Sequence, residues 1–133
     1  MSERTPKEWT RGAIRSHVRA SNQRLYAMRG ELVEKAGTVG ANIGPDIERL
    51  GDWLASEMEW LQTMDPVPEK MRRTERASFM ASYARSVARL VDDLQTAITK
   101  TREGQAVDAE GWKPVGVSML QVLAHGDSVL RMT

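Results

Sequence analysis

The sequence predicts an all-α protein, and three observations lead to that prediction. Apolar residues recur at alternating steps of four and three through residues 80–98, and a second stripe of this kind runs through residues 46–64. A capping pattern, followed by apolar residues at helical spacing, runs through residues 5–36. Such spacing collects apolar side chains on one face of a helix, whereas a half-buried strand requires strict alternation. We therefore expect helices throughout most of the chain.

Residues 5–36 are predicted to form a long N-terminal helix. Residues 5–8, Thr-Pro-Lys-Glu, match a capping box, with Thr5 as the N-cap and proline at the first helical position. Apolar residues then follow at helical spacing: Ile14, Val18, Leu25, Met28, Leu32 and Ala36. The polar triplet 21–23 stands where an apolar residue is due, so two helices meeting at a turn capped by its serine or asparagine are the alternative. We favour one helix because no glycine or proline marks a turn there.

An antiparallel helical hairpin is predicted for residues 46–64 and 69–103. The connector before it, residues 37–45, contains three glycines and a proline. It lacks the Gly-Lys-Ser/Thr ending of a phosphate-binding loop, so we interpret it as a plain loop. The turn inside the hairpin, Asp65-Pro66-Val67-Pro68, is short and stiff because proline supplies no amide donor and restricts the residue before it. Such turns are typical of antiparallel neighbouring helices.

The second helix of the hairpin carries the widest apolar ridge. Its seam is formed by Met80, Ala84, Val87, Val91, Leu94 and Ile98, widened by Tyr83, Leu90 and Ala97. Two helices with stripes this wide cannot bury them fully in each other. We therefore expect the hairpin to pack on the N-terminal helix, on a second copy of the chain, or on both. The predicted interface residues are Trp53, Trp60, Met80, Tyr83, Val87, Leu90, Val91, Leu94 and Ile98.

The C-terminal region is predicted to be small. Residues 104–114 are interpreted as a linker, and residues 115–124 as a short helix or strand through Val117, Leu120, Leu123 and Ala124. The chain then divides into a basic N-terminal helix (1–36), a helical hairpin core that mediates oligomerisation (37–103), and a linker with a small C-terminal element (104–133). The last of these is a candidate for docking another protein.

Composition places the chain among soluble single-domain proteins. It has 133 residues, of which 41% are hydrophobic and 28% charged, which is ordinary for a globular domain. The absence of cysteine excludes disulfides and thiolate chemistry and fits a reducing compartment. No apolar run approaches the ~18 residues of a membrane span. We therefore expect a cytoplasmic protein without membrane contact.

The net charge of +1 hides a strong segregation of charge along the chain. Residues 1–29 contain seven basic and two acidic residues, whereas residues 43–65 contain one basic and six acidic residues. Segregation of this kind indicates either complementary packing or a partner surface. A second basic cluster opens the third helix, where it opposes the helix dipole and indicates an acidic neighbour or a bound anion: Lys70, Arg72, Arg73 and Arg76.

A row of arginines makes the N-terminal helix a candidate nucleic-acid-binding element. On one helix, residues spaced by four and seven share a side, so these guanidiniums can follow phosphates, and each contact adds salt-dependent affinity. The predicted binding residues are Arg4, Lys7, Arg11, Arg15, Arg19 and Arg24. Either DNA or RNA suits such a row. The alternative is a solvated face, or a face that pairs with the acidic helix.

No group of residues has the spacing of a catalytic or metal site. The two histidines, His17 and His125, are far apart in sequence and have no carboxylate at a ligand spacing. The acidic pairs Glu57/Glu59 and Asp92/Asp93 cannot chelate readily, since close neighbours on a helix point apart, and we expect them to be solvated. We therefore expect no catalytic residue, no metal, no cofactor and no enzymatic activity.

The leading hypothesis is a non-enzymatic, self-associating helical protein that contacts nucleic acid through its basic N-terminal helix. This layout resembles, in architecture alone, the DNA-packaging small subunits of tailed phages. Those proteins have an N-terminal nucleic-acid-binding part, a central helical hairpin that forms a ring, and a short tail that docks a partner. The alternative is a protein-binding adaptor or inhibitor, in which the acidic helix with Trp53 and Trp60 docks a basic partner.

Overall fold

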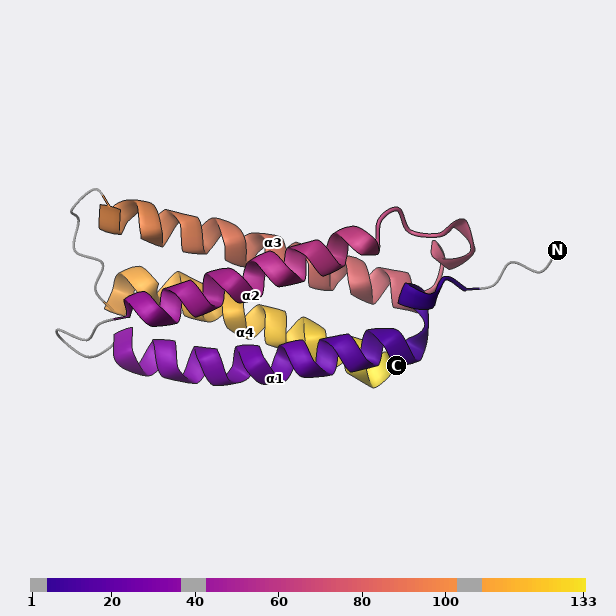
Figure 1. Cartoon of the computed structure of the whole chain (residues 1–133), viewed down its shortest axis with the longest axis horizontal. Coiled ribbons are helices and arrows are strands. Elements are labelled where there is room, and N and C mark those ends of the chain that lie inside the picture. Colours follow the sequence, from indigo (N-terminus) through magenta and orange to yellow (C-terminus); the bar gives the residue numbers. More distant parts are fainter. Residues whose placement is uncertain (1–4, 37–42, 103–108) are drawn as a thin grey trace.

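Four long helices that alternate in direction make up most of the described chain in the computed structural model (Figure 1). The structure describes residues 5–36, 43–102 and 109–133. The element order is η1 (Lys7–Trp9), α1 (Arg11–Ala36), α2 (Gly44–Thr63), η2 (Glu69–Met71), α3 (Glu75–Arg102) and α4 (Ala109–Met132), where η denotes a 3-10 helix. No strand occurs in these ranges, so the all-α prediction is confirmed. Among the described helices, none is both long enough and apolar enough to cross a membrane.

A single helix, α1, contains the polar triplet that could have divided it, but the helix starts later than predicted. The chain first makes the turn η1, and α1 begins after it, where Thr10 Oγ1 accepts the backbone N–H of Ala13 at 3.3 Å. The cap is therefore Thr10, and the predicted cap at Thr5 is wrong. The physical reason is Trp9, which is buried and donates from its indole N–H to the Met64 carbonyl at 3.2 Å. That contact holds η1 beside the end of α2, so the chain must redirect before α1 can start.

The C-terminal region is a long helix and not the short element expected. Residues 109–114, assigned above to a linker, belong to α4, and residues 104–108 lie outside the described residues. The buried residues of α4 recur at helical spacing: Trp112, Val115, Met119, Val122 and Val129. The predicted stripe was largely on the wrong face: Leu123 is buried, but Val117, Leu120 and Ala124 are exposed. Burial of this other face against α1 and α3 favours helix despite the β-branched residues of the segment.

The apolar ridge of α3 is covered by helices of its own chain. Its residues Met80, Tyr83, Val87, Leu90 and Leu94 are buried, while Val91 and Ile98 are half-buried. On α2, Trp53 is buried and Trp60 half-buried. The most extensive helix contacts join α3 to α4 and α1 to α4. All three regions predicted from the sequence contribute to one core, so the buried part of the ridge is not available to a second copy.

Ion pairs join the acidic α2 to the C-terminal end of α1. Asp46 is buried at the start of α2, with its carboxylate 3.2 Å from Lys35 Nζ and 2.8 Å from Arg49 Nη2. Burial alone would raise the pKa of Asp46, but hydrogen bonds and charges from Lys35 and Arg49 outweigh it and hold the pKa below the usual 3.8. Glu31 adds an exposed pair with Arg49 at 3.3 Å. Complementary packing therefore accounts for the segregated charge at this end of α1.

The substitution Asp46→Asn should destabilise the protein at neutral pH and have little effect in acid. Because the folded pKa is lowered, the contribution of the charged carboxylate is present above its unfolded pKa and is lost as the pH falls through the folded pKa. We expect a loss of about 1 kcal/mol in the free energy of unfolding at about pH 7, since solvent screens the half-exposed cations. Urea unfolding of both proteins at about pH 7 and about pH 2.5 measures this difference. An equal difference in the free energy of unfolding at both pH values would contradict the stabilising role of the ionised Asp46 carboxylate.

Gly126 allows α4 to approach α1 closely. A Cβ atom on this residue would lie 2.3 Å from Asn22 Oδ1 and 2.6 Å from Asn22 Nδ2. Asn22 is buried, and its Nδ2 donates to the Leu123 carbonyl at 3.3 Å and to Asp127 Oδ1 at 3.2 Å. Moving this amide aside would break both hydrogen bonds, so the contact between the two helices has no room for a side chain at position 126.

We expect Gly126→Ala to lower the free energy of unfolding by about 1–3 kcal/mol, the usual cost of overpacking a filled interior. In a helix, alanine is intrinsically more stable than glycine by about 0.5–1 kcal/mol. The expected destabilisation is therefore opposite in sign to the change that helix propensity alone would give. Gly30→Ala in α1 is the matched control, because its added methyl meets nothing within 4 Å, and it should stabilise the protein. Thermal or urea unfolding compares the three proteins. Stabilisation by both substitutions would disprove the close approach.

Candidate nucleic-acid interface

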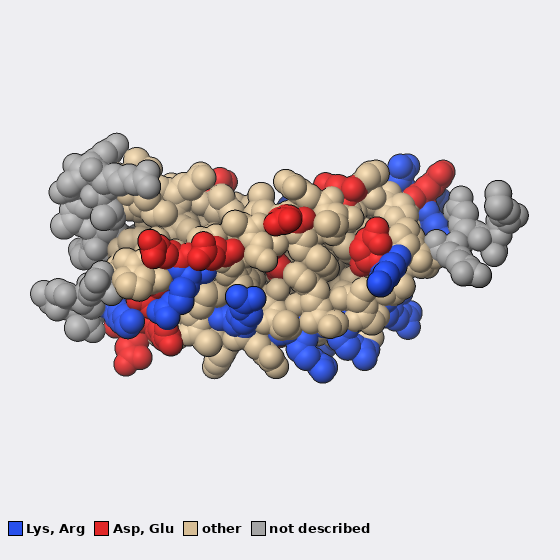
Figure 2. Space-filling model, in the orientation of Figure 1, with Lys and Arg blue, Asp and Glu red and all other residues tan. Residues whose placement is uncertain are grey.

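The N-terminal half of α1 presents a row of arginines to solvent. Arg11, Arg15 and Arg19 are four residues apart, and all three are exposed. Each step of four residues rotates the side chain by about 40° and advances it about 6 Å along the axis, so the three guanidiniums share one side of the helix. Arg24 is also exposed but lies about 140° round the helix from Arg19. Figure 2 shows Lys and Arg side chains gathered at the lower right of the molecule, over the N-terminal half of α1.

No aspartate or glutamate side chain of the described residues pairs with the arginines of this row. Every ion pair found in that part of the chain involves other cations, namely His17, Lys35 and Arg49. Arg15 donates instead to the main-chain oxygen of Thr133, which follows α4. Of the remaining predicted residues, Lys7 is exposed on η1, and Arg4 lies outside the described residues.

A further arginine joins the row at the end of the bundle where α1 and α3 start. Burial lowers the pKa of Arg76, and the nearby positive charge of Arg11 lowers it further. The guanidinium of Arg76 donates to the Trp9 carbonyl at 2.7 Å. Arg72 and Arg73, just before α3, are exposed. The basic start of α3 therefore has a positive neighbour in Arg11.

Small residues separate the cations on the outer face of α1. A shallow hollow of about 320 Å³ is lined by Gly12, Arg15, Ser16, Arg19, Ala20 and Gln23. Short side chains let a ligand come close to the helix surface, while the neighbouring guanidiniums donate hydrogen bonds from beside it. The arrangement suits an extended anion such as a phosphodiester chain.

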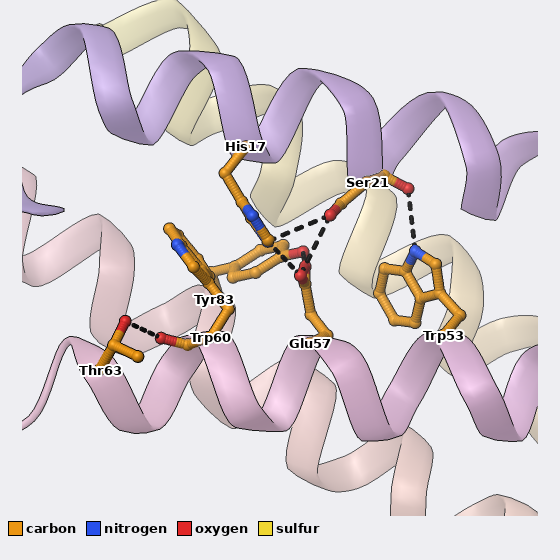
Figure 3. A network of polar contacts seen from close by, with 7 residues as sticks. All are labelled: His17, Ser21, Trp53, Glu57, Trp60, Thr63 and Tyr83. Carbon is orange, nitrogen blue, oxygen red and sulfur yellow. Dashed lines mark hydrogen bonds and ion pairs between the residues drawn. The ribbon is translucent and has the colours of Figure 1, made fainter.

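A buried polar cluster on the opposite side of α1 is the second candidate site. Glu57 of α2 is only 2% exposed, and donors from two other helices surround its carboxylate (Figure 3). Tyr83 of α3 donates its hydroxyl hydrogen to Oε2 at 2.5 Å. From α1, Ser21 donates to Oε1 at 3.0 Å, and His17 contacts the same oxygen through Nε2. The cluster therefore links three of the four helices.

Both tryptophans of α2 contribute to the same cluster. Trp60 stacks on the ring of His17, with ring centroids 3.7 Å apart and planes 8° from parallel. Trp53 donates its indole N–H to the Ser21 carbonyl at 3.2 Å. The pKa of Tyr83 is raised by burial and, in addition, by the charge and hydrogen bond of Glu57. Tyr83 thus remains a neutral hydrogen-bond donor within the core.

The cluster does not have the geometry of a Ser–His–acid triad. In a triad, the histidine meets the serine through one ring nitrogen and the acid through the other. Here Ser21 and Glu57 both lie at Nε2 of His17, and the serine hydroxyl is itself hydrogen-bonded to the carboxylate. The contacts satisfy a buried charge and hold helices together. The part of the chain that the structure describes also has no group of three or more histidine or acidic side chains placed to hold a metal ion.

The expectation that Glu57 is solvated is wrong, and the sequence contains a signal that could have corrected it. Glu57 occupies a seam position of α2, in the series Leu50, Leu54, Glu57, Leu61 and Met64 with steps of four and three. Ser21 occupies the equivalent place in α1, between Val18 and Leu25. Two polar residues at seam positions of neighbouring helices predict a buried polar contact. The contribution of His17 and Tyr83 could not be read in this way.

The substitution Tyr83→Phe should lower the free energy of unfolding by about 1–3 kcal/mol, because it leaves the buried Glu57 carboxylate with one donor fewer. Tyr26→Phe is the matched control: it removes the same hydroxyl from an exposed side chain and should change stability by less than about 0.5 kcal/mol. The raised pKa of Tyr83 adds a pH dependence, since its contribution is complete below the unfolded value of 10.0 and is lost as the pH rises towards the folded pKa. Denaturant unfolding from neutral to alkaline pH measures both effects. Equal stability of the two variants would refute the proposed role of the hydroxyl.

Comparisons with protein-family models, with curated proteins and with solved structures find no match to this chain. Its function must therefore be inferred from its own residues. Of the two candidate sites described above, the cluster around Glu57 is buried, whereas the arginine row of α1 is open to a macromolecular ligand.

Proposed function

We propose that this chain is a non-enzymatic helical protein that binds nucleic acid through Arg11, Arg15 and Arg19 on the outer face of α1. The observation that carries the proposal is the exposure of these guanidiniums together with the lack of an aspartate or glutamate partner among the described residues. Arg15 additionally donates to the main-chain oxygen of Thr133. Arg24 and Lys7, both exposed, extend the surface. Arginine is well suited to this role because its planar fork can donate two hydrogen bonds to one phosphate.

The spacing of the row supports a phosphodiester ligand. Arginines four residues apart are about 6 Å apart along the helix axis. Two nucleotide steps of one strand advance about 7 Å along a duplex axis, so every second phosphate can meet one guanidinium. Contacts of this kind depend on charge and not on base identity, and DNA and RNA both qualify.

DNA packaging in a tailed phage is one version of this function, and it additionally requires self-association into a ring. The apolar ridge that suggested self-association is covered within the chain, so a second copy would have to use another surface. The molar mass from light scattering at high protein concentration tests this version directly. A protein of 14.9 kDa alone in the absence of DNA, with a single protein molecule per complex in its presence, would eliminate it.

The alternative function is an adaptor that docks a basic partner through the tryptophans of the acidic helix, and these tryptophans are engaged inside the chain. Trp53 is buried and donates to the backbone of Ser21, while Trp60 is occupied by its stack with His17. Asp46, the most buried aspartate of that helix, is paired with Lys35 and Arg49. These groups are committed to contacts inside the chain.

Binding to a labelled oligonucleotide, titrated over a series of salt concentrations, tests the proposal. The double variant Arg15→Ala/Arg19→Ala should bind more weakly than the parent protein. The slope of its plot of log K against log salt concentration should be smaller in magnitude than that of the parent by about 1–2. The control is Arg85→Ala/Arg89→Ala, which removes two exposed arginines at the same spacing from α3, a helix without extensive contact to α1. This control has the same net charge as Arg15→Ala/Arg19→Ala but should bind nearly as tightly as the parent protein does.

Two results would overturn the proposed function. One is the absence of any complex with DNA or RNA at low salt. The other is an equal loss of affinity in both double variants, because that would reflect net charge and not the row on α1. Circular dichroism of each variant confirms that the helices remain folded.

A further inference from the structure

Tyr26 is an aromatic side chain that the fold leaves in water. It lies in the middle of α1 and is 74% exposed. Of the five exposed large apolar residues in the described part of the chain, four lie on α1 and α4: Tyr26, Val33, Val117 and Leu120. The edge where these two helices meet is therefore the main exposed apolar surface of the described chain, and it calls for a ligand with apolar faces.

A groove of about 590 Å³ runs along this edge. Tyr26 from α1 and Leu120 from α4 line it, together with the buried Asn22 and Leu123. The two hydrogen bonds that Asn22 donates to α4 hold the helices in place, so the groove is formed before a ligand arrives. Its volume exceeds that of a nucleobase several-fold and leaves room for a planar ring beside Tyr26.

The groove is continuous with the arginine row. Arg19 and Gln23 line both the groove and the shallow hollow that contains Arg15. Arg19 and Tyr26 are seven residues apart, which places them on the same side of α1 at a separation of about 10 Å along its axis. A strand whose phosphates lie on the row therefore reaches Tyr26 within about three nucleotides.

We propose that the groove between α1 and α4 is a base-stacking subsite, in which an unpaired base of a nucleic-acid strand stacks on Tyr26 while adjacent phosphates bind Arg15 and Arg19. This inference rests on the proposed function and specifies its ligand as single-stranded nucleic acid. Every base has a π face that stacks on an aromatic ring, whereas the bases of a duplex are already stacked and paired. Gln23, exposed at the rim, adds a donor and an acceptor for a base edge or phosphate.

The charge of the surroundings favours a polyanion over a second copy of the chain. Two charged residues line the groove: Arg19, and Asp127, whose Oδ1 accepts a hydrogen bond from Asn22. Beyond Arg19 the row continues to Arg15 and Arg11, which pair with no described aspartate or glutamate, so positive charge predominates on that side of the groove. A twofold contact through this edge would bring the same basic surface of another copy to the same place. A phosphodiester strand supplies the opposite charge and an apolar ring in one ligand.

Fluorescence anisotropy with three labelled ligands of equal length tests the subsite: a single strand, the same strand without bases, and a duplex. The parent protein should prefer the single strand. Tyr26→Ala should weaken binding of the single strand by roughly 5- to 150-fold, the usual contribution of one stacked base, and should leave the abasic strand unchanged. Tyr26→Phe keeps the ring and should bind as the parent does. Met58→Ala, an exposed apolar residue on α2, is the control for loss of apolar surface.

The outcomes separate the subsite from the function on which it rests. Equal binding of the single strand by the parent protein and by Tyr26→Ala overturns the subsite, while loss of binding in Arg15→Ala/Arg19→Ala would still support the proposed function. Failure of every strand to bind at low salt overturns both. A doubled molar mass that Tyr26→Ala returns to 14.9 kDa would instead identify the groove as a dimer interface and overturn the subsite.

Discussion

The buried carboxylate of Glu57 is the constraint on which the arrangement of the first three helices depends. A charged group removed from water is tolerated only when donors replace its hydration. Those donors come from Tyr83 on α3 and from Ser21 and His17 on α1. Apolar packing alone would allow the helices to slide or rotate by a residue at modest cost. A displacement that separates the carboxylate from its donors leaves the charge unpaired, so the cluster specifies one register.

The rotation of α1 that satisfies this cluster also determines which side chains face solvent. Arg19 precedes Ser21 by two residues, which is about 200° of helix rotation. A helix that directs Ser21 towards Glu57 must therefore direct Arg19 away from the core. Asn22, hydrogen-bonded to α4, and the close contact at Gly126 hold the same rotation from a second side. The candidate interface is thus a geometric consequence of how the interior is satisfied.

The two ends of α1 use charge in different ways. At its C-terminal end, Glu31 and Lys35 pair with residues of α2, and Asp46 is held ionised between two cations. At its N-terminal end, Arg11 and Arg76 lie near each other, and neither forms an ion pair with a described aspartate or glutamate. Like charges kept together at a surface cost stability, and a bound polyanion would offset that cost.

The sequence by itself determined the helical class and the buried face of α3, because the heptad spacing of apolar residues is a local property. It also determined that α1 continues through its polar triplet, because no turn residue stands there. Tertiary structure decided the rest. Helix α4 forms although its local signals are weak, because Val115, Met119 and Val122 are buried against neighbouring helices. Glu57 is buried because its donors lie elsewhere in the sequence. The groove beside Tyr26 exists only where two helices meet, and no pattern within one helix encodes such a surface.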